Sequence, residues 1–111
     1  MKLMLPIFSL FLSTVSYAGP DYDEMIKGLP KEVVSIIDRR IGCNYWPGEM
    51  PNNPNEPEVR ESGRPQMIEK NLKKLKCSHL EKDETAIQKK YKNKKNVIEA
   101  LKQASTMNPT D

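Results

Sequence analysis

The chemically most distinctive side chains of this sequence lie in the segment Cys43-Asn44-Tyr45-Trp46-Pro47-Gly48-Glu49. Two interpretations of this segment are open. Trp46 could cover a disulfide and fill a thin core, with Gly48 permitting a turn. Alternatively, Trp46 and Glu49 could mark a patch for a ligand or partner, because tryptophan offers a large contact area at low entropic cost. The candidate binding residues are therefore Tyr45, Trp46, Gly48 and Glu49.

The chain has two cysteines, Cys43 and Cys77. In an oxidising compartment an even pair predicts one disulfide. Closing a loop of this size would stabilise the fold by roughly 3–4 kcal/mol. The spacing does not resemble a Cys-x-x-Cys redox motif. Zinc binding by both cysteines with His79 and a carboxylate has no recognised ligand spacing, so we expect neither a metal nor a cofactor.

His79 is the sole histidine of the sequence. A cysteine–histidine nucleophile with Cys77 would need a free thiol, which the expected disulfide removes. A small hydrolase that uses Glu49 and His79 is the remaining catalytic alternative. It requires these two side chains to lie within reach of one bridging water. Because the sequence holds no convincing catalytic constellation, we predict that the protein is not an enzyme.

Residues 1–18 have the three parts of a secretory signal peptide. Lys2 provides a positive start, an apolar stretch follows from Leu3 to Leu12, and Ser16-Tyr17-Ala18 fits the small-x-small cleavage rule. The apolar stretch is too short to cross ~30 Å of hydrocarbon. We therefore expect cleavage before Gly19, no transmembrane segment afterwards, and a periplasmic or secreted protein.

A basic cluster near the C-terminus consists of Lys89, Lys90, Lys92, Lys94 and Lys95. The net charge is +6 over residues 66–104 and −3 over residues 19–65. Such asymmetry can dock two parts of one chain, bind an anionic partner, or simply solvate a helical face. A solvated helical face is the favoured interpretation. If the cluster binds a partner, export argues against nucleic acid and favours an anionic lipid surface, lipopolysaccharide or an acidic protein.

The composition suits one small domain. The chain has 111 residues, of which 37% are hydrophobic and 30% charged. These values exclude a multidomain enzyme, a polytopic membrane protein and a large enclosed cofactor cavity. Residues 1–18 hold many of the apolar residues, and the remaining chain is poor in leucine, isoleucine and valine. The folding stability of a domain with so small a hydrophobic core depends strongly on its disulfide.

Apolar side chains recur at helical spacing and predict an all-α fold, a small bundle of three to four helices. We expect residues 19–29 to be a polar N-terminal segment, residues 30–104 a single helical domain, and residues 105–111 a flexible tail. Gly42 is a natural helix stop. The helices are expected over residues 30–41, 66–76 and 81–92, with a fourth that begins after Asn93 or Asn96 and ends at Ala104.

Residues 44–65 lack an apolar period and contain five prolines and several asparagines. This composition predicts a long loop, with at most one short helical turn near Glu58–Glu61. The disulfide would join the C-terminal ends of the first two helices of the domain, because bridged Cα atoms lie within about 7 Å. The chain must then travel back before the second helix begins, so we expect the loop to be a return crossover.

The motif Cys43-x-Tyr45-Trp46-x-Gly48-Glu49, followed by Cys77, resembles a group of small exported bacterial proteins of uncharacterised function. Members share a Cys-x-His/Tyr-Trp-x-Gly-Glu motif, a second cysteine about 30 residues on, and a C-terminal Tyr…Val-x-x-x-Leu helix, which Tyr91, Val97 and Leu101 match. The resemblance implies export, helices and one disulfide. It implies no activity.

These observations favour a non-catalytic, exported binding protein of the bacterial cell envelope. The most specific version of this hypothesis is an inhibitor or immunity-type protein that contacts an envelope partner through the loop around Trp46 and Glu49. The principal alternative is a binder of anionic lipid or lipopolysaccharide that uses the lysine cluster. The small hydrolase is the weakest alternative.

Overall fold

The computed structural model describes residues 20–109, and the signal peptide expected over residues 1–18 lies outside this range. The described chain contains, in order, α1 (Pro20–Ile26), α2 (Lys31–Tyr45), the 3-10 turn η2 (Trp46–Glu49), α3 (Pro57–Glu61), α4 (Arg64–Lys74), the 3-10 turn η3 (Cys77–His79), α5 (Leu80–Lys90) and α6 (Lys95–Ala104). Residues 20–109 hold no β-strand, so the all-α class is confirmed. Six helices form where we expected three to four, because α1 forms within the expected polar segment and the short helical turn expected near Glu58–Glu61 is the helix α3.

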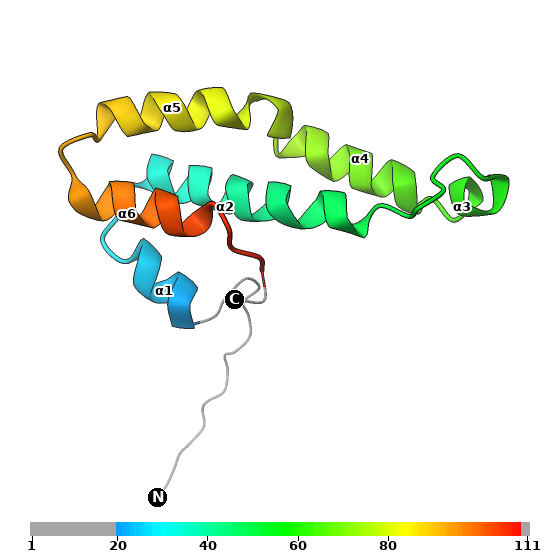
Figure 1. Cartoon of the computed structure of the whole chain (residues 1–111), viewed down its shortest axis with the longest axis horizontal. Helices are drawn as coiled ribbons and strands as arrows, with labels where there is room; N and C mark the ends of the chain where they lie inside the picture. The colour runs from blue at the N-terminus through cyan, green and yellow to red at the C-terminus, as the bar shows by residue number, and fades with distance from the viewer. Residues whose placement is uncertain (1–19, 110–111) are drawn as a thin grey trace, which may run out of the picture.

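The main core lies where α2 packs against both α5 and α6 (Figure 1). Val33, Ile37 and Ile41 recur every four residues of α2 and are at most 1% exposed. This spacing places them on one face of the helix. The remaining buried members are Ile36 from α2, Leu80 and Ile87 from α5, Val97, Ala100, Leu101 and Ala104 from α6, and Met107 beyond it.

The polar N-terminal segment is more ordered than its composition indicates. It forms α1, whose side chains Tyr22, Met25 and Ile26 pack against the main core. The Tyr22 hydroxyl also donates a hydrogen bond of 2.5 Å to Oδ1 of Asp38 on α2. The helix therefore covers one side of the bundle.

The helix stop that we predicted at Gly42 is wrong, because α2 continues to Tyr45. The glycine serves close packing instead. A Cβ atom at Gly42 would lie 2.7 Å from Cδ1 of Leu75, which is tighter than real contacts allow. Cys43 consequently lies within the last turn of α2 rather than beyond its end.

Most of the expected loop over residues 44–65 is helical. Only residues 50–56 separate η2 from α3 without forming a helix. The prolines are compatible with these helices, because proline is tolerated in the first turn of a helix, where its missing N–H needs no partner. Pro47, Pro57 and Pro65 occupy such positions in η2, α3 and α4.

The path of this segment also differs from the expected return crossover. The chain continues past α2 through η2, α3 lies at the far end of the molecule, and α4 leads back toward α5 (Figure 1). We call residues 46–74 the arm. Within it, α4 packs against η2 and α3, and its buried residues are Pro65 and Ile68. Ile68 is 0% exposed but lies outside the main core cluster, so the arm has an apolar centre of its own.

The segment from Ser105 onward was expected to be a flexible tail, but its first residues are held against the domain. Nδ2 of Asn44 lies 3.3 Å from the carbonyl oxygen of Ala104, 3.2 Å from that of Ser105 and 3.0 Å from that of Met107. Met107 is only 6% exposed. The packed part of the domain therefore extends through Met107, because a side chain of α2 binds the backbone that follows α6.

Candidate functional site

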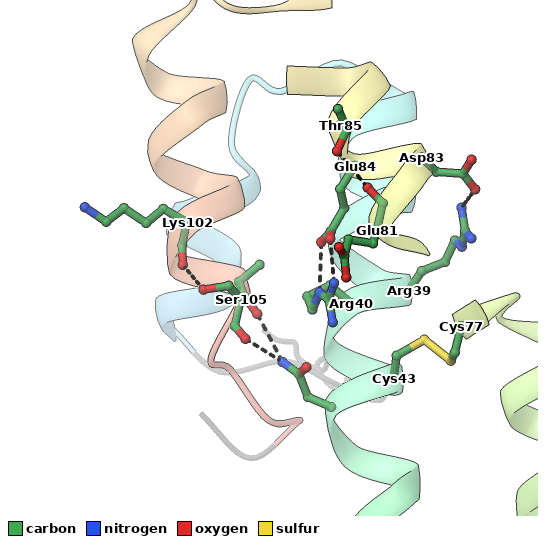
Figure 2. Close-up of polar contacts among 12 residues, drawn as sticks. Arg39, Arg40, Cys43, Cys77, Glu81, Asp83, Glu84, Thr85, Lys102 and Ser105 are labelled. Carbon is green, nitrogen blue, oxygen red and sulfur yellow. Dashed lines mark hydrogen bonds and ion pairs between the residues drawn. A yellow bond between two sulfur atoms is a disulfide. The ribbon is translucent and has the colours of Figure 1, made fainter. Parts of the chain in front are cut away.

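The expected disulfide is present and joins Cys43 of α2 to Cys77 of η3, with Cα atoms 5.7 Å apart (Figure 2). It connects the last turn of α2, which precedes the arm, to η3, which follows the arm. The arm is thus covalently closed at its base. This constraint restricts how η2 and α4 can move relative to the main core.

Arg39 holds the backbone beside this disulfide. Its Nε donates to the carbonyl oxygen of Leu75 at 2.7 Å, and its Nη2 donates to that of Lys76 at 3.0 Å. Its Nη1 reaches Oδ2 of Asp83 on α5 at 2.9 Å (Figure 2). One guanidinium therefore joins α2, the turn after α4 and α5.

A second arginine ties α2 to α5. Arg40 binds Glu84 through two hydrogen bonds, at 2.8 Å from Nε and 2.5 Å from Nη2, and both side chains are mostly buried (Figure 2). The hydrogen bond with Glu84 raises the pKa of Arg40. The disulfide and the two arginines together fix the base of the arm on the bundle.

The aromatic pair predicted to form a binding patch lies at the junction of α2 and this arm. The rings of Tyr45 and Trp46 meet edge to face, with centroids 5.0 Å apart and planes inclined at 73°. Both residues are half-buried, and neither belongs to the main core cluster. Trp46 therefore does not fill the main core.

Glu49 and Gly48 complete the predicted patch. Oε1 of Glu49 accepts a hydrogen bond of 2.6 Å from Nη2 of Arg64, at the start of α4. Gly48 is exposed, with nothing within 4 Å of the position of a Cβ atom. Beyond η2, residues 52–57 line a hollow of about 480 Å³ that is rich in asparagine and proline. The arm and its junction with α2 thus offer amide groups, one ion pair and two partly exposed rings.

The pair required by the hydrolase hypothesis does not assemble. Glu49 is bound to Arg64 at one end of α4, whereas His79 lies beyond the opposite end. A helix of this length spans about 16 Å at 1.5 Å per residue, far more than one bridging water can cover. Within residues 20–109, histidine, cysteine and carboxylate side chains form no group that could hold a metal ion.

Comparison with family models, with curated proteins and with solved structures finds no match for this chain. None of the helices within residues 20–109 has the length and apolar character needed to cross a bilayer.

The basic cluster divides into one paired lysine and four unpaired ones. Nζ of Lys90 lies 2.6 Å from Oε2 of Glu32, and the Tyr91 hydroxyl donates to the same oxygen. The hydrogen bond from Lys90, and next that from Tyr91, lowers the pKa of Glu32. The members that are exposed and form no ion pair within residues 20–109 are Lys89, Lys92, Lys94 and Lys95.

Sequence reasoning missed a second basic site. A hollow of about 540 Å³ lies where α4 ends and α5 begins, and it is lined by Lys73, Lys76, Ser78, His79, Lys82 and Asp83. These lysines are spread along the sequence rather than clustered, so no local motif marks them. The turn between the two helices brings them together.

Proposed function

We propose that the chain is a non-catalytic binding protein of the bacterial cell envelope, periplasmic or secreted, and that it recognises an envelope protein through the arm. An inhibitor or immunity-type role is the most specific version of this proposal. One observation carries it: Tyr45 and Trp46 form a partly exposed aromatic pair where α2 meets an arm that is closed by a disulfide.

The physical argument is preorganisation. A binding surface loses less conformational entropy on association when its side chains are already fixed in the free protein. The disulfide fixes the base of the arm, and the ion pair between Glu49 and Arg64 connects η2 to α4. Trp46 lies between these two constraints and can supply the large, rigid contact area typical of binding hot spots.

Affinity capture from an envelope extract, followed by reconstitution with the purified partner, tests this proposal. The bait is the mature, oxidised protein, compared with Trp46→Ala combined with Glu49→Ala. We expect the double variant to weaken binding by at least about tenfold, equivalent to about 1.4 kcal/mol, while its helical circular dichroism is retained. The matched control, Lys92→Ala with Lys95→Ala, should keep its affinity. Unchanged binding by a folded Trp46/Glu49 variant would show that the arm is not the contact surface.

A second candidate function, binding to anionic lipid or lipopolysaccharide, is favoured by the four unpaired lysines of the C-terminal cluster. Lysines near a membrane surface attract anionic headgroups, and salt screens this attraction. The Lys92/Lys95 variant should then lose binding to anionic vesicles, and the binding of the unmodified protein should fall steeply with salt. Absent or salt-insensitive binding would reject this role.

A further inference from the structure

The hollow between α4 and α5 combines three lysines with a histidine and a serine hydroxyl. A neighbouring hollow of about 310 Å³ runs along α4 and shares Lys73 with it. Their basic members are Lys70, Lys73, Lys76, His79 and Lys82. The larger hollow has the volume typical of small-molecule sites in proteins.

The charge of this hollow is not compensated by its own lining. Asp83 is its one carboxylate residue, and Nη1 of Arg39 binds that carboxylate at 2.9 Å (Figure 2). Arg39 is only 18% exposed, so it neutralises Asp83 from the protein side. Within the described residues, the ammonium groups of Lys73, Lys76 and Lys82 form no ion pair. The hollow therefore presents an excess of positive charge.

Lys76 has an unusual backbone conformation. Its φ of 54° and ψ of 47° lie in the left-handed region, and it is the one residue other than glycine with positive φ within residues 20–109. Glycine is the ordinary choice at this position after a helix, because a side chain there is strained. The turn nevertheless carries a lysine, and Arg39 holds its carbonyl oxygen in place.

We propose that this hollow binds a phosphate group, with Lys73, Lys76 and Lys82 supplying charge and Ser78 supplying a hydroxyl donor. Lysine ammonium groups bind phosphate as point charges, and three of them around one hollow suit a multiply charged anion. Arg39 is a positioning residue, because it neutralises Asp83 and fixes the turn that carries Lys76. This site is independent of the arm surface proposed above.

Pyrophosphate is the probe for the first experiment, an isothermal titration of the mature, oxidised protein at low salt. Replacing Lys73 and Lys82 by glutamine should weaken pyrophosphate binding by at least about tenfold. The control variant, Lys92→Gln with Lys95→Gln, removes the same net charge from the C-terminal cluster and should bind within about twofold of the unmodified protein. No binding by the unmodified protein, or equal weakening in both variants, would overturn the proposal.

Lys76→Gly separates binding from folding. Glycine tolerates the left-handed conformation, so this variant should raise the melting temperature while weakening pyrophosphate binding. A purely structural role for Lys76 would leave pyrophosphate binding unchanged, and that result would overturn the proposed site.

Vesicles distinguish the two sources of such a phosphate. Binding to phosphatidic acid vesicles, absent with phosphatidylcholine alone and lost in the Lys73/Lys82 variant, would identify a lipid headgroup. Pyrophosphate binding without vesicle binding would identify a soluble phosphorylated ligand. Either outcome supports the site.

Discussion

Leu75, in the chain that leaves the arm, packs the end of its side chain against Gly42 of α2. A Cβ atom at Gly42 would lie 2.7 Å from Cδ1 of Leu75, next to the disulfide at Cys43. The obstructing atom belongs to the end of a half-buried leucine side chain, so it can be displaced at moderate cost. The close packing of these two residues is therefore measurable by substitution.

Gly42→Ala should reveal this contact in a double-mutant cycle. Alanine within a helix stabilises by about 1 kcal/mol relative to glycine, so Gly42→Ala should stabilise a Leu75→Ala background by about that amount. In the unmodified background, displacement of Leu75 should cancel most of the gain. The expected coupling is roughly 0.5–1.5 kcal/mol in urea unfolding. Equal effects in the two backgrounds would show that the two residues do not compete for space.

The disulfide should contribute a large share of the stability of this small domain. Replacing Cys43 and Cys77 by serine should lower the free energy of unfolding by roughly 3–4 kcal/mol on the chain-entropy model, because the cross-link constrains the unfolded chain. Urea unfolding of the oxidised, reduced and serine-substituted proteins measures this. The reduced protein should match the serine variant, and a loss below about 1 kcal/mol would show that the noncovalent contacts of Arg39 suffice.

The sequence predicted what depends on local pattern. Repeats of valine, isoleucine and leucine at helical spacing located α2, α4, α5 and α6 to within a few residues, and the even cysteine count predicted the disulfide correctly. The sequence did not predict that Gly42 allows close packing with Leu75, or that several prolines occupy the first turns of helices. Glycine is compatible with both a helix stop and close packing, and only the tertiary position of Leu75 decides between them.

The candidate site was less predictable for a similar reason. The sequence draws attention to Tyr45, Trp46 and Glu49 because these distinctive side chains lie close together. Their exposure, however, depends on how α4 packs against η2. Lys73 and Lys82 are ordinary helical lysines, nine positions apart. They share a hollow because the chain turns through a left-handed Lys76, where sequence rules favour glycine.

Asn44 should control the order of the segment after α6. Asn44→Ala removes the amide that lies near three backbone carbonyl oxygens of residues 104–107, and this should cost about 1–2 kcal/mol. Hydrogen exchange should become faster across residues 104–107 while the amides of α2 around Ile37 remain protected. Unchanged exchange in this segment would show that the burial of Met107 alone holds it.

Asp38 should give the domain a distinctive pH dependence. Burial raises the pKa of Asp38 above its ordinary value of 3.8, and the hydrogen bond from Tyr22 offsets part of this effect. The folded state therefore binds the proton more tightly than the unfolded state. The contribution of this group to stability is most favourable below pH 3.8 and is lost as the pH rises through the folded-state pKa.

Asp38→Asn removes this titration. The stability of this variant relative to that of the unmodified protein should therefore increase from pH 3 to pH 7. The relative gain should be less than about 1 kcal/mol, because residual solvent screens the carboxylate. Urea unfolding of both proteins at the two pH values measures the difference and cancels the other titrating groups. Tyr22→Phe is the complementary variant. It removes the hydrogen bond that favours the charged form, so its loss of stability should be larger at pH 7 than at pH 3. A difference between Asp38→Asn and the unmodified protein that stays constant with pH would show that α1 does not bury the carboxylate.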